Sequence, residues 1–267
     1  MRAKYKFLAS AVAGGTGLAA ILGSIGAAAG SAAALAANAS GRHAAPAVLS
    51  GRLGPLWTSS NWSGYAIGTK TTPKHTYNSV SAKWRVPTIK ANTGTKYSSQ
   101  WIGIDGFTNQ SLIQTGTEVD SIGGHGVYRA WWEILPAPET PIGDPVKPGE
   151  TITASITHSS STGKWTITIS NGTWTFTKTT SYGGAGQSVE WIVEAPQVGG
   201  SIASIAHTGR VTFSAIMANG SNPKLVAAEG GNLRQNGKIR ETPSLPSALG
   251  DAFTMGYGAK VPPAPKG

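Results

Sequence analysis

The stretch KWTITISNGTWTFTK, residues 164–178, decides the fold class of this chain. Its first half alternates apolar residues with threonines, which is typical of a strand that has one buried face. The apolar residues of this half are Trp165, Ile167 and Ile169. Asn171-Gly172 predicts a two-residue turn, after which Trp174 and Phe176 alternate on the way back. The stretch therefore predicts a β-hairpin.

The same alternation recurs on both sides of this hairpin. It is found in SVSAKWRVP (79–87), GVYRAWWEIL (126–135), ETITASITH (150–158) and GRVTFSAIMA (209–218). After residue 40, no helical periodicity extends beyond about three turns. Many short strands with turn residues between them predict an all-β fold, a sandwich of two antiparallel sheets. We expect this domain to span residues 57–259 and to be followed by a mobile Pro-rich tail, residues 260–267.

The N-terminal region has a different composition. Three basic residues among the first six precede a long Ala/Gly/Leu run that ends in Ala34-Leu35-Ala36. This pattern is typical of a secretory signal peptide over residues 1–36, and a retained membrane anchor is the alternative. Residues 37–56 lack periodicity and are interpreted as a linker or a short pro-segment. We expect cleavage near Ala36 and later loss of residues up to Leu56, by self-cleavage in acid.

Composition excludes several classes of function. The chain has no cysteine, which excludes disulfides, thiol catalysis and Cys-based zinc sites. It contains no H-E-x-x-H and no G-x-S-x-G motif, so the signatures of most zinc and serine hydrolases are missing, although a Ser/His pair formed in space stays open. The net charge is +10, but Lys and Arg are scattered singly. Scattered charges do not indicate a nucleic-acid surface.

The carboxylates are distributed unevenly. All twelve lie between Asp105 and Asp251, and five fall in strand-like or aromatic-rich segments. These five are Asp105, Glu118, Glu133, Glu190 and Glu194. Because Asp and Glu are depleted from strands and rarely buried unpaired, the set suggests a lined cleft, with ordinary outward-facing positions as the alternative. Such a cleft suits an acid peptidase, a β-sandwich glycoside hydrolase or a non-catalytic lectin-like module.

Gln114 bears on the choice between these classes. It lies in SLIQTG between an apolar residue and a Thr-Gly turn, and a buried amide is costly without partners. Its NH₂ group can donate to a developing oxyanion, and it still donates in acid because it does not titrate. This favours a peptidase, since a glycosidase builds positive charge on the sugar. A structural glutamine bonded to the backbone is the alternative.

Six motifs in order then resemble one family. They are SNWSGY (60–65), VSAKWRVPT (80–88), QWIGIDG (100–106), LIQTG (112–116), YRAWWEILP (128–136) and VEWIVE (189–194). Over roughly Ser59 to Met255 the chain resembles the glutamic peptidases, or eqolisins. The resemblance implies a secreted, extracellular acid endopeptidase on a concanavalin-like sandwich, acting on proteins or peptides without metal or cofactor. We expect a monomer that has no membrane contact once the signal peptide is removed.

The resemblance also implies site residues. The catalytic dyad falls on Gln114 as oxyanion donor and on Glu194 as general base and then acid. The residues that orient the dyad or bind substrate fall on Trp62, Trp101, Asp105 and Glu133. Glu190 is interpreted as a supporting or rim residue. The basic charge, the lack of cysteine and Ala195-Pro196 after the last motif differ from the fungal members and suggest a bacterial-type member.

Overall fold

The computed structural model describes residues 43–46, 57–68, 76–90 and 94–266. The expected signal peptide and most of the expected linker or pro-segment lie outside the described residues, so these expectations stay predictions. Within the described ranges, no helix has the length and apolar character needed to cross a membrane.

Almost all regular structure in the described residues is β. A single turn of 3₁₀ helix, η1, spans Ala227–Glu229. In chain order, the strands are β1 (Trp57–Ser59), β2 (Trp62–Gly68), β3 (Ser79–Arg85), β4 (Ser99–Ile104), β5 (Ile113–Ile122), β6 (His125–Ile134), β7 (Thr140–Ile142), β8 (Thr151–Ser159), β9 (Lys164–Ser170), β10 (Thr175–Thr180), β11 (Ser188–Glu194), β12 (Gln197–Val198), β13 (Ser201–Ile202), β14 (Val211–Ala218), β15 (Gly230–Gln235), β16 (Lys238–Pro243) and β17 (Phe253–Tyr257).

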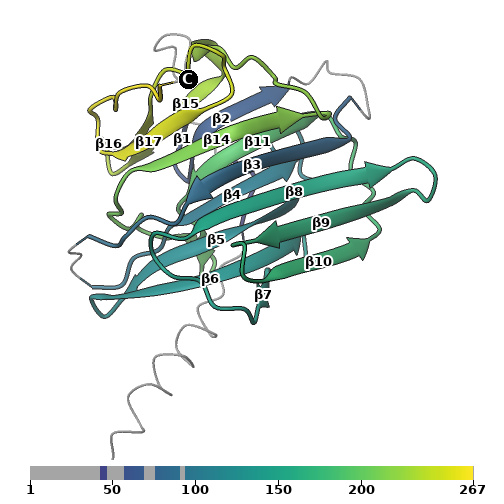
Figure 1. Ribbon diagram of the computed structural model, residues 1–267. Helices are drawn as coiled ribbons and strands as arrows, with labels where there is room; N and C mark the ends of the chain where they lie inside the picture. Colours follow the sequence, from purple (N-terminus) through teal and green to yellow (C-terminus); the bar gives the residue numbers. More distant parts are fainter. Residues whose placement is uncertain (1–42, 47–56, 69–75, 91–93, 267) are drawn as a thin grey trace, which may run out of the picture.

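The strands pair in one path that folds over on itself. Its order is β10-β9-β8-β3-β14-β17-β16-β15-β2-β11-β4-β5-β6-β7, with antiparallel neighbours, and β1 joins β15 in parallel. The short β12–β13 hairpin stands apart. Figure 1 shows β3, β8 and β9 in front of β4 and β5, and the apolar core lies between these two layers. The predicted sandwich of two antiparallel sheets is confirmed.

The hairpin that decided the fold class differs in one detail. Trp165, Ile167 and Ile169 are buried as expected. Strand pairing stops at Ser170↔Thr175, so four residues form the loop and the predicted two-residue turn is wrong. The Asn171 side-chain oxygen accepts the backbone N–H groups of Thr173 and Trp174, at 3.0 and 3.1 Å. This side-chain turn replaces the tighter backbone turn that Asn-Gly favours.

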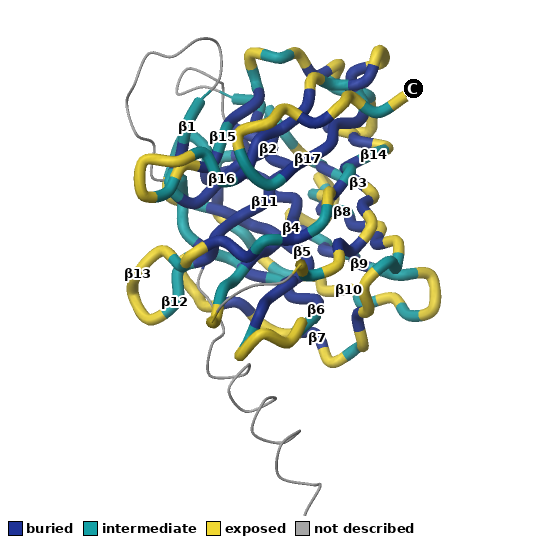
Figure 2. The backbone as a smooth tube through the Cα atoms, turned by 90° about the vertical axis from the view of Figure 1, so that its left-hand side faces the viewer, coloured by how far each residue is buried: buried dark blue, intermediate teal, exposed yellow. Residues whose placement is uncertain are grey.

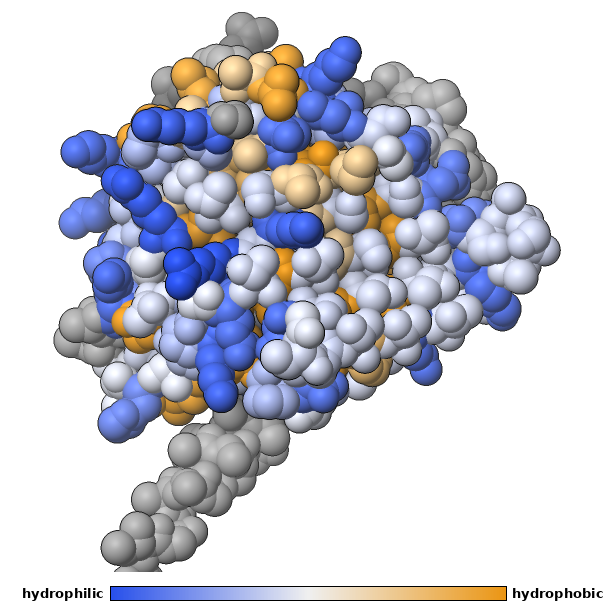
Figure 3. All heavy atoms as spheres, viewed as in Figure 1, coloured by the Kyte–Doolittle hydropathy of each residue, from blue (hydrophilic) through white to orange (hydrophobic). Residues whose placement is uncertain are grey.

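The outer face of the β3–β8–β9 layer is polar. Serine, threonine and the exposed Lys83 and Arg85 alternate there with buried apolar residues. Figure 3 shows this face as mostly pale, with hydrophilic residues spread among short side chains. The period-two pattern of the sequence therefore separates this surface from the core.

The C-terminal segment is described as far as Lys266. It forms no strand after β17, and Pro262 is buried although Val261 is exposed. Part of the segment therefore packs against the domain, while the predicted mobility of residues 260–267 stays a prediction.

Candidate active site

One sheet face collects most of the predicted site residues. The neighbouring strands β11, β4, β5 and β6 pair in a continuous register. Three cross-strand rows follow from it: Glu190–Gly103–Gln114–Glu133, Ile192–Trp101–Gly116–Trp131 and Glu194–Ser99–Glu118–Arg129. Residues two apart on a strand share a face, so all three rows lie on one face, opposite the apolar core. We call it the catalytic face, after the catalytic residues Gln114 and Glu194 that the sequence analysis predicts there.

A small tryptophan-rich cluster occupies the middle of the catalytic face. Its buried members are Trp62, Trp101, Leu112, Trp131 and Ile192. Glycine makes room for it: a Cβ atom at Gly103 would lie 2.8 Å from Trp101 Cζ3, and one at Gly116 would lie 2.5 Å from Trp101 Cβ. Every residue of β4 and β11 is buried, as the dark tubes in Figure 2 show. The catalytic face is therefore covered, although it points away from the other layer.

Glu194 ends β11 and is fully buried. The indole N–H of Trp101 donates to its Oε2 at 2.9 Å, and the amide of Asn61 donates to its Oε1 at 3.4 Å. His43 Nδ1 lies 2.8 Å from Oε2, and the backbone N–H of Ala44 lies 3.4 Å from Oε1. Glu194 is thus held from both sides by donors.

Gln114 and Glu133 face each other across β5 and β6. Gln114 Nε2 donates to Glu133 Oε2 at 2.6 Å, which uses one of its two N–H groups. Gln114 Oε1 and Glu133 Oε1 are buried without a hydrogen-bond partner among the described residues. Burial raises the pKa of Glu133 to about 8, with a further contribution from the charge of Glu194. The amide of Gln114 therefore contacts the Glu133 carboxyl group and keeps an oxygen without a hydrogen-bond partner among the described residues.

The two predicted cleft tryptophans meet on this face. Trp62 packs edge-on against Trp101, with ring centroids 4.8 Å apart. Trp101 also donates to Glu194, so it does more than form an apolar wall. Trp62 Nε1 is buried without a partner among the described residues. An unpaired indole N–H at this point adds a donor for a ligand.

Asp105 lies apart from this group. Its carboxylate accepts the Asn109 amide, the Tyr182 hydroxyl and the backbone N–H groups of Gly186 and Gln187, all at 2.8 Å. None of these contacts involves Gln114 or Glu194. Asp105 therefore fixes the loop that precedes β11, and the predicted role in orienting the dyad has no direct contact to support it.

Glu190 is not a rim residue, because it is fully buried. Burial raises its pKa well above the ordinary value, and the charge of Asp105 adds to the shift. Neither oxygen has a well-formed hydrogen bond among the described residues. Glu190 shares a row with Gln114 across Gly103, which makes it the natural comparison for Glu194 in any test.

An acidic pocket lies at the Glu194 end of the face, and the sequence analysis found only Glu118 of its members. Glu118 and Glu139 lie there with Arg129, whose Nη2 donates to Glu139 at 3.0 Å. His43 Nε2 lies 3.3 Å from Glu118 and 3.2 Å from Glu139. His43 precedes Glu194 by 151 residues, and no local spacing predicts that contact. The one available signal was that Glu118 follows the Q-T-G motif on the same strand face.

The same pocket has ligand-type atoms at metal-binding distances. One atom each of His43, Glu118 and Glu139 lies within 4.8 Å of the others. Both ring nitrogens of His43 already face carboxylates, and Arg129 is bound to Glu139. This pattern fits a protonated imidazole that donates from both nitrogens better than a metal ligand, which must be neutral.

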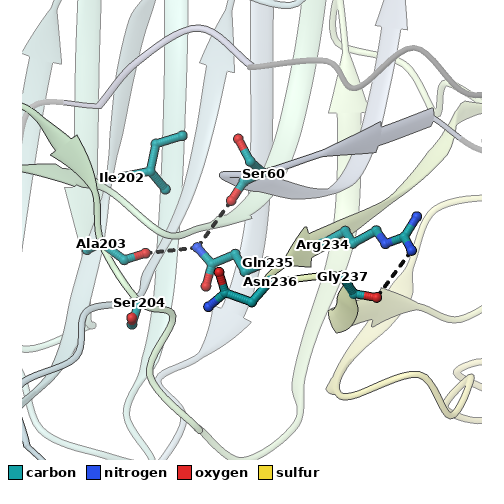
Figure 4. A pocket seen from close by; sticks show the side chains of 8 residues that line it. All are labelled: Ser60, Ile202, Ala203, Ser204, Arg234, Gln235, Asn236 and Gly237. Carbon is teal, nitrogen blue, oxygen red and sulfur yellow. Dashed lines mark hydrogen bonds between the residues drawn. The ribbon is translucent and has the colours of Figure 1, made fainter.

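A separate surface pocket of about 510 Å³ opens beside the catalytic face. Figure 4 shows its centre, where Gln235 Nε2 donates to the carbonyl oxygens of Ser60 and Ala203, at 3.2 and 2.8 Å. Ser60 precedes Asn61, which contacts Glu194. Among the described residues, no carboxylate lines this pocket.

The fold and the site together define a glutamic peptidase: a β-sandwich with a buried carboxyl and a buried amide on one sheet face. The chain belongs to the Peptidase A4 family, whose sequence model matches residues 60–247. The glycosidase and lectin alternatives are thereby set aside.

Members of this family resemble the chain in sequence and in fold. The chain is 28% identical to Aspergillopepsin-2 of Aspergillus niger over 226 residues, which covers 74% of this chain and 78% of the relative. It is similar to a crystal structure of scytalido-glutamic peptidase with a transition state analog inhibitor, with TM-score 0.60 and 23% identity over 74% of this chain and 98% of the other. Aspergilloglutamic peptidase from Aspergillus niger gives TM-score 0.51 and 26% identity over 61% of this chain and 99% of the other.

The buried carboxyls lead to a prediction about stability and pH. Burial raises the pKa of Glu241 to about 8, as it does for Glu133. A raised pKa means that the folded state retains a proton that the unfolded state releases. Stability from these groups is therefore complete below the ordinary glutamate pKa of ~4.3 and is lost as the pH rises through about 8. We expect Tm to fall between pH 4 and pH 8.

Glu241→Gln tests this expectation away from the catalytic face. It should raise Tm at pH 8 by at least ~2–4 °C, the shift that about 1 kcal/mol causes in a domain of this size, and should leave Tm at pH 4 nearly unchanged. Glu150→Gln is the matched control, because Glu150 lies at the surface and its pKa is lowered by the backbone N–H of Lys147. Calorimetry at both pH values measures the effect, and a wild-type Tm that rises from pH 4 to pH 8 would contradict it.

Proposed function

We propose that the chain is an exported endopeptidase active in acid, in which Glu194 activates water and Gln114 stabilises the oxyanion. The observation that carries this proposal is that one sheet face holds both a buried carboxyl group bonded to Trp101 and a buried amide bonded to Glu133. The family relationship to Aspergillopepsin-2 supports the peptidase assignment, and the signal-peptide pattern of residues 1–36 supports export.

The proposed chemistry uses each group in sequence. Glu194 takes a proton from water, and the water oxygen attacks the peptide carbonyl carbon. The second N–H group of Gln114 donates to the oxygen that gains negative charge. Glu194, now protonated, returns its proton to the departing amine as the C–N bond breaks. Gln114 Oε1, which has no partner among the described residues, is available to hold the attacking water.

The supporting groups explain why these two side chains stay in place. Trp101 and Asn61 fix the two oxygens of Glu194, and Glu133 fixes the amide plane of Gln114. A preorganised donor stabilises charge without the cost of reorganising during the reaction. We infer that Trp62 and Trp101 provide the apolar surface on which a peptide substrate lies.

The experiment that tests the function is a zymogram of secreted protein. Parallel gels contain denatured protein or polysaccharide and are developed at pH 4. We expect a cleared band only in the protein gel, unchanged by a chelator. Clearing of the polysaccharide gel alone, or of neither gel by protein that has lost its N-terminal segment, would contradict the proposal.

A further inference from the structure

The surface of the domain is basic because most of its carboxyl groups are inside. Eight of the twelve Asp and Glu residues are buried, and the other four are only partly exposed. None of the lysine and arginine residues that the structure describes is buried. A ligand that approaches from solution therefore meets positive charge, which attracts anions and raises their local concentration.

Four of these cations gather at one edge of the domain, although they are far apart in the sequence. β3 and β14 are antiparallel neighbours, which brings Arg85 at the end of β3 beside Arg210 just before β14. The chain after β3 stays next to the chain before β14, where the N–H of Lys90 donates to the carbonyl of His207 at 2.9 Å. β17 pairs with β14 on its other side and leads to Lys260. Strand pairing thus assembles a basic cluster that no sequence spacing shows.

Two hollows lie at this cluster. One, of about 250 Å³, has Lys90, Arg210 and Lys260 in its lining. The other, of about 360 Å³, has Arg85 in its lining together with the same Lys90 and Arg210. The hollows adjoin because they share these two residues, and we call the pair the basic groove. Among the described residues, no Asp or Glu lines either of them.

The backbone around the basic groove is held in place. Arg85 Nε donates to the carbonyl of Gly149 at 2.8 Å, which fixes the base of this side chain against the loop before β8. Pro262 is buried against β17, where a Cβ atom at Gly256 would lie 3.4 Å from its Cγ. The chain that carries Lys260 is therefore anchored on both sides of that residue. A groove that is already formed loses less freedom when a ligand binds.

The protein does not neutralise the cations of the basic groove. Three of them form no ion pair with a described carboxylate: Arg85, Arg210 and Lys260. Glu150 directly precedes the β8 residue that pairs with Arg85. Its carboxylate is bound elsewhere, to the N–H of Lys147 at 2.9 Å and the amide of Asn171 at 3.1 Å. The charge of the groove is therefore available to an anion.

The kind of anion follows from the acid conditions in which the peptidase is proposed to work. Carboxyl groups of a polymer lie near their pKa of ~4 there and carry only part of their charge, whereas lysine and arginine stay charged. A phosphodiester, as in a nucleic-acid backbone, keeps its negative charge. A site for single-stranded nucleic acid also offers aromatic faces on which bases stack. In the basic groove one face of Tyr257 is covered by His207, with ring centroids 4.2 Å apart.

We propose that the basic groove binds a linear polymer whose negative charges are phosphodiesters and which carries no bases. The choice of phosphodiester over carboxylate rests on the proposed activity in acid. The groove lies at the end of the layer that contains β3, whereas the catalytic face belongs to the other layer. Binding therefore leaves the catalytic face open, and the groove holds the peptidase on an anionic matrix while it acts on peptides.

The test measures binding of a poly(glycerol phosphate) chain at pH 4 by calorimetry at several salt concentrations. Four cations in contact with phosphates predict that log K falls with log salt with a slope of about −3. The double variant Arg210→Ala/Lys260→Ala should bind at least ~10-fold more weakly at 50 mM salt and should flatten the slope by about 1.4. Both side chains are exposed, so Tm should stay at its wild-type value.

The matched control is Lys164→Ala/Lys178→Ala, which removes the same charge from β9 and β10, two and three strands away from β3. It should bind the polymer as wild type does. Equal binding by wild type and the groove variant, or an equal loss in the control, would overturn the proposal.

Two other polymers of the same length test the ligand class. Poly-glutamate should bind at least ~10-fold more weakly at pH 4, because its carboxyl groups are partly protonated. Single-stranded DNA should bind no more tightly than poly(glycerol phosphate), since the groove offers bases no stacking platform. Equal binding of poly-glutamate, or tighter binding of DNA, would overturn the assignment to a base-free phosphodiester polymer. Hydrolysis of a short uncharged peptide should be equal in wild type and the groove variant. Polymer binding by a chain without peptidase activity would retain the groove and reject the proposed function.

Discussion

Glu194→Gln should lower kcat/KM for peptide hydrolysis by roughly 10⁴-fold or more, the upper end of what one acid–base group contributes. The expected loss is this large because one carboxyl group performs both proton transfers. Glutamine keeps the shape and can still accept the Trp101 N–H, which lies 2.9 Å from Oε2. The variant should therefore fold normally, with an unchanged Tm at pH 4, while the rate falls. Hydrolysis of a chromogenic peptide measures the rate.

Glu190→Gln is the matched control for this result. Glu190 lies on the same strand and face, is equally buried, and shares a row with Gln114. The charge of Glu194 contributes to the raised pKa of Glu133. The charge that adds to the raised pKa of Glu190 is instead that of Asp105, which follows β4. We therefore expect a loss of less than ~10-fold, as for a group outside proton transfer. Equal damage from the two substitutions would show that Glu190 takes part in the chemistry.

Gln114→Ala should lower kcat by roughly 10²–10³-fold, the usual loss when one oxyanion donor is removed. The donor acts mainly in the transition state, so KM should change little. The substitution also leaves Glu133 Oε2 without the N–H that lies 2.6 Å from it. The raised pKa of Glu133 means that its carboxyl group is protonated in acid. Loss of the Gln114 N–H should therefore cost less stability than it would if Glu133 were a buried charged carboxylate.

The matched control for Gln114 is Gln197→Ala. Gln197 donates to the carbonyl of Gly200 at 2.9 Å in the small β12–β13 hairpin and belongs to no catalytic contact. Steady-state kinetics should show wild-type kcat for this variant. A Gln114→Ala enzyme with wild-type kcat and a raised KM would mean that the amide binds substrate without stabilising the oxyanion.

Much of the fold was predictable because alternation along a strand is a local property. Trp165, Ile167 and Ile169 alternate with polar residues, and all three enter the core. The stretch Glu190–Glu194 also behaves as predicted, with Trp191 and Val193 in the main core and both glutamates on the other face. A period of two is enough to assign faces without knowing which strands are neighbours.

The parts of the site that sequence could not predict depend on long-range contacts. Arg129 meets Glu139 only because β6 and β7 pair, and His43 meets Glu194 across 151 residues. The contacts of Asp105 were also not predictable: its partners are Asn109 and residues on the loop at 182–187, and its expected role beside the dyad stays a prediction. Motif proximity does not fix the direction of a side chain at the end of a strand, where Asp105 has a φ of 70°.

Whether one carboxyl group acts as both base and acid is best measured by the pH dependence of kcat/KM for processed enzyme, with an unfolded protein as substrate and a chelator present. A single carboxyl that serves as base and then as acid works best near its own pKa, and carboxyls titrate in acid. Glu133, with a pKa of about 8, stays largely protonated over the acid range and gains its negative charge beside Gln114 only above it. We predict that kcat/KM has its maximum at about pH 3–5 and is low at pH 7. A maximum at or above neutrality, or loss of activity with the chelator, would contradict it.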